Sequence, residues 1–223
     1  MEIIKRTSLD AWITALEYIL PSGHRLHDCN NRTSHEVLGL RIEITDPAEG
    51  IDEPIKFLHT FKQWVYPSMD EIASIILTKR LSPTYVYSYG NSLFNHEHVN
   101  QIDDFIIPLL KKDSSSRRAV ATLWNPRQVA ESKEGIMPSL IFIDFKLRDN
   151  KLHLTAFIRS TDMFFGWPAN LYQLFILQQY VKEKLNCELG SLVTYSTSAH
   201  LFEEHLDDVY SVLERKSGIR TYS

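Results

Sequence analysis

Residues 138–170, PSLIFIDFKLRDNKLHLTAFIRSTDMFFGWPAN, decide the fold of this chain. Side chains alternate between apolar and polar over 139–147 and again over 152–158, which predicts two β-strands. The four residues between them (RDNK, 148–151) are typical of a turn, so the pair is expected to be an antiparallel hairpin. One side of the first strand should carry Ser139, Ile141, Ile143, Phe145 and Leu147.

Polar side chains gather where the second strand ends, at Arg159, Ser160, Thr161 and Asp162. Polar residues that converge at the end of a strand indicate a site more strongly than polar residues along its face. Gly166 and Pro168 follow and are expected to stop any regular element. A long helix over 171–185, ended by Gly190, is predicted next.

The rest of the chain alternates between helical and extended patterns. Ser8 is expected to cap a helix over 8–20, and Ser68 a helix over 69–81. Residues 23–34 read as a polar, basic loop, and Tyr89-Gly90 as a turn. The remaining predicted elements are a strand over 37–45, a helix over 56–66, a helix over 100–110 and a strand over 191–202.

Composition describes an ordinary soluble protein. The 223 residues are 43% hydrophobic and no linker divides them, so one domain over 1–223 is expected. The formal net charge of −4 argues against a nucleic-acid or membrane surface, and no apolar run approaches a membrane span, so we expect a cytoplasmic location. Cys29 and Cys187 suggest no disulfide framework, and His24 and His27 lack further metal ligands, so no metal site is predicted.

Residues 159–170 match the pattern Arg-Ser-x-Asp-x-x-x-Gly-x-Pro-x-Asn at every fixed position. Further blocks agree in the expected order, namely Asn31-Arg32-Thr33, Tyr89-Gly90, DSSSRRAVATLWNP over 113–126 and His200-Leu201-Phe202. With these blocks the chain resembles the thymidylate synthase family, the folate-dependent enzymes that modify C5 of pyrimidine nucleotides. The Ile143-Asp144-Phe145 run and the short chain resemble the archaeal-type and nucleotide-hydroxymethylase branch.

The resemblance implies an α/β fold, with a large mixed β-sheet packed with helices and a sheet-to-sheet homodimer. It implies a pyrimidine nucleoside monophosphate as substrate and 5,10-methylenetetrahydrofolate, or a related pterin, as cofactor. Arg32, Arg159 and Ser160 would bind the nucleotide phosphate. Arg117 and Arg118 would reach across the dimer interface and complete the site of the other subunit, since planar forked donors suit a phosphate dianion.

Further roles follow from the same resemblance. Tyr89 would contact the base, Asn170 would read the pyrimidine edge with one acceptor and one donor, and His200 would contact the sugar. Asp162 would help to hold folate or its proton network. Phe202 stands where the family usually has tyrosine, which removes one hydroxyl contact to the ribose. The expected catalytic residues are Ser139, Arg159, Asp162 and Asn170.

One departure limits what the resemblance implies about activity. The family's nucleophile is a cysteine after a proline, and here Met137-Pro138 is followed by Ser139. A serine hydroxyl is a weak nucleophile unless a base activates it. Three hypotheses remain: a family enzyme whose cysteine is replaced, naturally or by design; a catalytically silent nucleotide-binding homologue with a regulatory or scaffolding role; and a different C5 chemistry, such as hydroxymethylation of a cytidine nucleotide. The choices of base, sugar and product stay open.

Overall fold

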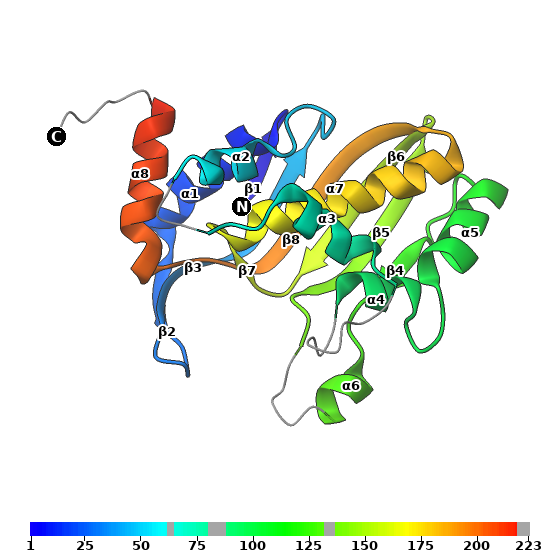
Figure 1. Ribbon diagram of the computed structural model, residues 1–223, viewed down its shortest axis with the longest axis horizontal. Coiled ribbons are helices and arrows are strands. Elements are labelled where there is room, and N and C mark those ends of the chain that lie inside the picture. Colours follow the sequence, from blue (N-terminus) through cyan, green and yellow to red (C-terminus); the bar gives the residue numbers. More distant parts are fainter. Residues whose placement is uncertain (62–64, 80–87, 132–136, 218–223) are drawn as a thin grey trace.

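The computed structural model describes residues 1–61, 65–79, 88–131 and 137–217. One eight-stranded mixed sheet runs through it in the order β1-β3-β8-β6-β5-β4, with β2 paired to β3 and β7 paired to β8 (Figure 1). Strand β8 runs parallel to β6 and β7 and antiparallel to β3. The strands are β1 (Glu2–Lys5), β2 (His24–His27), β3 (Thr33–Ile44), β4 (Val120–Thr122), β5 (Leu140–Arg148), β6 (Lys151–Ile158), β7 (Thr161–Asp162) and β8 (Glu188–Phe202).

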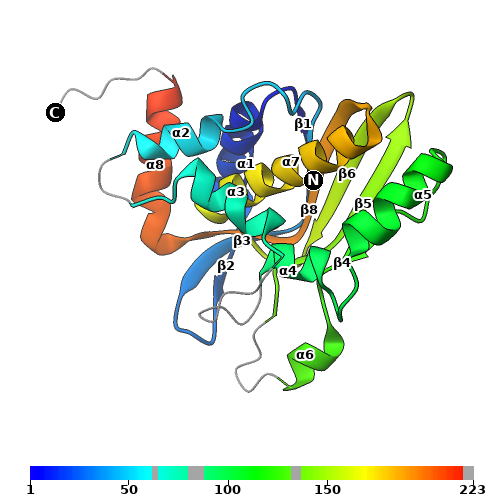
Figure 2. The ribbon, with the colours of Figure 1, turned by 45° about the vertical axis from the view of Figure 1, so that its right-hand side comes forward.

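The two longest helices pack on one face of this sheet. Helix α1 contacts β3 and β8, and helix α7 contacts β6 and β8, so together they cover the middle of the sheet (Figures 1 and 2). The helical elements are α1 (Ser8–Ser22), α2 (Glu53–His59), α3 (Met69–Leu77), α4 (Tyr89–Phe94), η1 (Gln101–Ile106), α5 (Ile107–Lys112), α6 (Pro126–Glu131), α7 (Gly166–Leu185), η2 (Glu203–His205) and α8 (Leu206–Ser217). This arrangement confirms the α/β fold with a large mixed sheet packed with helices.

Apolar side chains on the helix-covered face form the core. Trp12 and Leu16 of α1, and Leu40 of β3, are fully buried there. The opposite face is different in character, because Leu38 is 72% exposed and an aromatic ladder runs across three strands. The rings of Phe142 and Phe157 stack with centroids 5.1 Å apart, and Phe157 stacks on Tyr195 at 5.2 Å.

The hairpin is confirmed, with one correction. Asp149 and Asn150 both have positive φ, as a two-residue turn between β5 and β6 requires. The register shifts between Leu140 and Phe142, so a bulge interrupts the alternation. Leu140 is therefore buried on the core face in place of Ile141, and the predicted grouping of Ile141 with Ile143 was wrong.

Glycine and proline positions account for two further corrections. Gly166 does not stop regular structure but begins α7, with Pro168 in the first turn, where the missing N–H of proline costs no helical hydrogen bond. At its other end α7 finishes at Leu185, capped by Asn186 in the left-handed conformation, and Gly190 lies inside β8.

Helix capping was predicted correctly at one site and missed at another. Ser68 caps α3 with Glu71 in a reciprocal capping box. Thr7, not Ser8, caps α1, because the Ser8 hydroxyl is buried and donates to the carbonyl of Gly50 at 2.6 Å. Tyr89 and Gly90 begin the short helix α4 instead of forming an isolated turn.

Several element boundaries also differ from expectation. The polar loop over 23–34 contains strand β2, whose four exposed residues carry no apolar alternation that could have predicted it. The helix over 100–110 begins as the π-helical turn η1, in which Phe105 is 45% exposed. The helix predicted over 56–66 is α2, Glu53–His59, and the ends predicted at 62–66 and 80–81 fall partly outside the described residues.

Candidate functional site

Four neighbouring strands bring the predicted site residues to one end of the sheet. Ser139 precedes β5, Arg159 follows β6, His200 lies near the end of β8, and Arg32 precedes β3. The strands are adjacent in the order β5-β6-β8-β3, so these four residues lie on neighbouring strands. The candidate site is therefore a row of residues that crosses four strands at this end of the sheet.

At the Ser139 end of the row, Arg159 forms hydrogen bonds with the backbone around Ser139. The backbone N–H of Arg159 donates to the carbonyl of Ser139 at 2.8 Å. The guanidinium donates to the two preceding carbonyls, from Nε to Pro138 at 3.1 Å and from Nη2 to Met137 at 2.9 Å. Arg159 thus places a cation beside the start of β5 and holds the backbone that presents Ser139.

Two carboxylates flank His200 in the middle of the row. Asp162 pairs with His200 across β7 and β8, and Glu36 pairs with it across β3 and β8. Residues opposite each other in a sheet point to the same face, so the three side chains are neighbours. Burial lowers the pKa of His200 below its usual value of 6.5, while the carboxylates of Asp162 and Glu36 act in the opposite direction.

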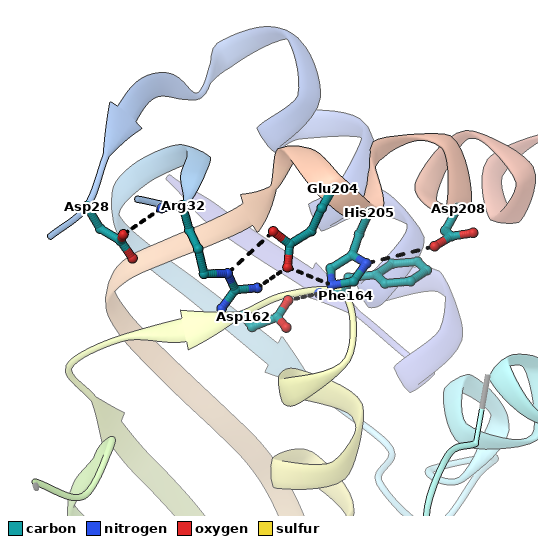
Figure 3. A network of polar contacts seen from close by, with 7 residues as sticks. All are labelled: Asp28, Arg32, Asp162, Phe164, Glu204, His205 and Asp208. Atoms are coloured by element: carbon teal, nitrogen blue, oxygen red, sulfur yellow. Dashed lines mark hydrogen bonds and ion pairs between the residues drawn. The ribbon is translucent and has the colours of Figure 1, made fainter. Parts of the chain in front are cut away.

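Arg32 lies at the far end of the row in a polar network (Figure 3). Its Nη2 donates to Oε1 of Glu204 at 2.5 Å, and its guanidinium carbon is 3.3 Å from the ring centroid of Phe202. The backbone N–H of Arg32 donates to the carboxylate of Asp28 at 2.8 Å. Figure 3 also shows the carboxylate of Asp162 close to this ion pair, where it accepts from the N–H of Phe164 at 2.9 Å.

Three other predicted residues lie on elements around the row. Ser160 is half-buried between Arg159 and Asp162, and Asn170 is half-buried near the start of α7. Tyr89 is at the first position of α4, which Ser88 caps, and α4 packs on α3, which in turn packs on α7. These contacts place Tyr89 two helices away from Asn170.

The structure does not bring Arg117 and Arg118 to this row within one chain. Both are exposed, and they precede β4, in which Val120 pairs with Asp144. Asp144 is five residues along β5 from Ser139, which corresponds to about 17 Å at 3.4 Å per residue. Arg117 and Arg118 lie further along in the same direction, so they are remote from the Ser139 of their own chain.

Sequence reasoning missed three acidic residues of the site. Asp28 and Glu36 flank the arginine motif, and Glu204 follows the His200-Leu201-Phe202 block by two residues. Closeness to recognised blocks was a signal that could have marked them. A set of at least three histidine, cysteine or carboxylate side chains able to hold a metal ion was not found within the described ranges. In the same ranges, none of the helices has the length and apolar character needed to span a membrane.

Comparisons with known proteins identify relatives of this chain. The family model described as Thymidylate synthase matches residues 32–221. A "Putative thymidylate synthase" of Methanosarcina barkeri is 33% identical over 210 residues, covering 94% of this chain and 93% of its own. A protein of the same description from Methanococcoides burtonii is 32% identical over 211 residues, covering 94% and 93%.

A bacterial relative matches a smaller part of the chain. Thymidylate synthase 1 of Bacillus spizizenii is 30% identical over 144 residues, which is 62% of this chain and 50% of its own length. The family match starts at Arg32 and includes every residue of the row described above. With this extent of similarity, the chain belongs to the thymidylate synthase family.

Proposed function

We propose that the protein binds a pyrimidine nucleoside monophosphate along the row from Ser139 to Arg32 and transfers a one-carbon unit to C5 of its base. The observation that carries the proposal is the row itself. Arginine and imidazole side chains come together with Ser139 at one end of the sheet, and a nucleotide needs such cationic and polar groups for its phosphate and sugar. Family membership supports folate-dependent transfer of this kind at the level of the family.

Each group in the row has a chemical task in this proposal. Arg32, Arg159 and Ser160 bind the phosphate, His200 binds the sugar, and Tyr89 and the amide of Asn170 contact the base. Arg159 also fixes the backbone that carries Ser139, through its bonds to Met137 and Pro138. A charged guanidinium beside a thiol would favour the thiolate, which is the form that adds to C6 of a pyrimidine.

The pterin cofactor fits the donor set next to the base. Asp162 is half-buried near the start of α7, and a carboxylate in such a place is a suitable acceptor for the amino and amide N–H groups of a pterin. When bound, 5,10-methylenetetrahydrofolate supplies the one-carbon unit that C5 receives. Asp162 would hold the pterin, and Asn170 would hold the pyrimidine edge.

The site is proposed to be completed by a second subunit. Arg117 and Arg118 are exposed and at least about 17 Å from Ser139 along β5, so they are free to serve another chain's phosphate site. The sheet face without the long helices carries exposed Leu38 and the Phe142–Phe157–Tyr195 ladder. An apolar sheet face of this kind supports homodimer formation through the sheets.

One observation favours a second candidate function. The charged residue that the structure shows bonded to the backbone at Ser139 and Pro138 is Arg159, which is a cation and cannot act as a general base. A serine that no general base activates is a weak nucleophile. The second candidate is therefore a nucleotide-binding homologue that keeps the site and lacks the reaction, with a regulatory or scaffolding role.

Calorimetric titration with dUMP, dCMP, UMP and CMP tests the binding that both candidates share. We expect one base to be preferred, and we expect Asn170→Ala to reduce that preference because the amide reads the pyrimidine edge. Glu71→Gln is the matched control, since Glu71 belongs to the exposed capping box of α3. Failure of all four nucleotides to bind would refute the proposed function.

A further inference from the structure

Glu204 occupies the fork of Arg32. Nη2 is 2.5 Å from Oε1 of Glu204, and Nε is 3.4 Å from Oε2 of the same carboxylate. Nε and Nη2 form one edge of the guanidinium, and paired donors along such an edge are what bind a phosphate in bidentate fashion. A nucleotide phosphate that uses this edge must displace Glu204.

Arg32 does not need Glu204 to hold its position. Asp28 fixes the backbone of the β2–β3 turn, accepting from the N–H of Arg32 at 2.8 Å and from the N–H of Asn30 at 2.9 Å. The ring of Phe202 supports the guanidinium from below at 3.3 Å, which is a cation–π contact. Two groups other than Glu204 therefore contact Arg32, one at its backbone and one at its guanidinium.

We propose that Glu204 is an internal competitor that the substrate phosphate must displace from Arg32, so that it weakens the binding of ligands with a phosphate group and leaves the binding of an uncharged nucleoside unchanged. This inference rests on the proposed function of the row. A monoester dianion carries more charge and more acceptor oxygens than a carboxylate, so it can displace Glu204. An uncharged nucleoside has no phosphate to bind Arg32, so the Arg32–Glu204 ion pair stays formed.

A displaced Glu204 has an imidazole nearby that can receive it. His205 Nε2 is 3.7 Å from Oε1 of Glu204, and His205 Nδ1 is 3.8 Å from the carboxylate of Asp208 at the start of α8 (Figure 3). The imidazole of His205 packs edge-on against the ring of Phe165, with centroids 5.0 Å apart. Glu204 can therefore turn from Arg32 toward His205 without losing all of its polar contacts.

The adjacent glutamate offers a matched control. Glu203 pairs with Arg25 at 2.6 Å and with His35 at 3.4 Å, and makes no ion pair with Arg32. Glu203→Gln and Glu204→Gln remove the same charge one residue apart. An effect of overall charge appears in both variants, whereas competition for Arg32 appears only in Glu204→Gln.

The experiment is calorimetric titration of the full chain and both variants with dUMP, dCMP, UMP and CMP, and with deoxyuridine and inorganic phosphate. Glu204→Gln should bind the preferred nucleotide roughly three- to tenfold more tightly, because an exposed ion pair and a like charge beside the phosphate are both removed. Its affinity for inorganic phosphate should rise in parallel. The affinity of Glu204→Gln for deoxyuridine should equal that of the parent. Glu203→Gln should bind every ligand with the affinity of the parent.

Two results would overturn the inference. Equal or weaker nucleotide binding by Glu204→Gln, with the parent binding normally, would mean that Glu204 positions Arg32 or is unconnected with phosphate, and the proposed function would stand. Absence of nucleotide binding by the parent and by both variants would remove the proposed function and the inference together. Circular dichroism spectra and melting curves of the variants establish that each is folded.

Discussion

Replacing Gly90 by alanine would force the start of α4 against the end of α3. A Cβ at this position would lie 2.5 Å from the carbonyl oxygens of Ile75 and Thr78 and 2.7 Å from the backbone N of Thr78. These are backbone atoms, which cannot turn away as the end of a side chain can. The helices must separate, and Tyr89, the neighbour of Gly90, must move with α4.

The expected cost follows from the size of this clash. Overpacking in a closely packed place typically costs about 1–3 kcal/mol of unfolding free energy. In a protein of this length, 1 kcal/mol corresponds to roughly 2–4 °C in melting temperature. We therefore expect Gly90→Ala to melt about 2–12 °C below the parent, and to bind nucleotide more weakly because Tyr89 is displaced.

Gly166→Ala is the matched control for this prediction. A Cβ there would meet only the Cβ of Asp162 at 3.4 Å, which is ordinary van der Waals contact, and Gly166 begins α7 with no positive φ. It should melt within about 2 °C of the parent. Thermal unfolding followed by circular dichroism measures both. The reasoning would be refuted if Gly90→Ala had the melting temperature of the parent, or if the melting temperature of Gly166→Ala were lowered as much as that of Gly90→Ala.

The remaining predictions concern the row. Arg159→Lys should lower the unfolding free energy by about 1.5 kcal/mol in urea titrations, since an ammonium cannot serve both carbonyls that the fork reaches; an unchanged midpoint would contradict this. Arg32→Ala and Arg117→Ala should each abolish tight dUMP binding. When the two variants are mixed and exchange subunits, half of the dimers contain one chain of each and hold one complete site, so about a quarter of all sites should bind dUMP again. If no binding returns, the site is not shared between subunits. Glu36→Gln should lower the pKa of His200 further below 6.5, as measured by NMR, because the Glu36 carboxylate favours the protonated imidazole. In the parent protein the pKa of His200 is already lower in the folded than in the unfolded state, so the protein should lose stability as the pH falls below 6.5.

Local sequence signals predicted the hairpin and the parts of the site that lie on it. Alternation and turn composition led to β5 and β6, and the polar residues after β6 do lie at the end of the sheet beside Ser139. The bulge at Ile141 could not be read in this way, because apolar residues at 140–143 are compatible with either register. Only pairing with β6 decides which of them is buried.

Long-range geometry accounts for what the sequence could not predict. The place of His200 between Glu36 and Asp162 depends on the strand order β3-β8-β7, which no local pattern contains. The ion pair of Arg32 with Glu204 joins residues 172 positions apart. Resemblance to a family named Arg32 as a phosphate ligand, but it gave no indication of the carboxylate that faces it.

Release of tritium from C5-labelled nucleotides tests the central claim most directly, because addition to C6 loosens the hydrogen on C5. The assay compares the parent protein with Ser139→Cys, using dUMP, dCMP, UMP and CMP with and without methylenetetrahydrofolate. We expect release by Ser139→Cys from at least one nucleotide, and little or none by the parent, because the proposed site keeps its binding residues and lacks only a thiol. If Ser139→Cys binds a nucleotide but releases no tritium from any of the four, the claim that Ser139 occupies the nucleophile position is contradicted.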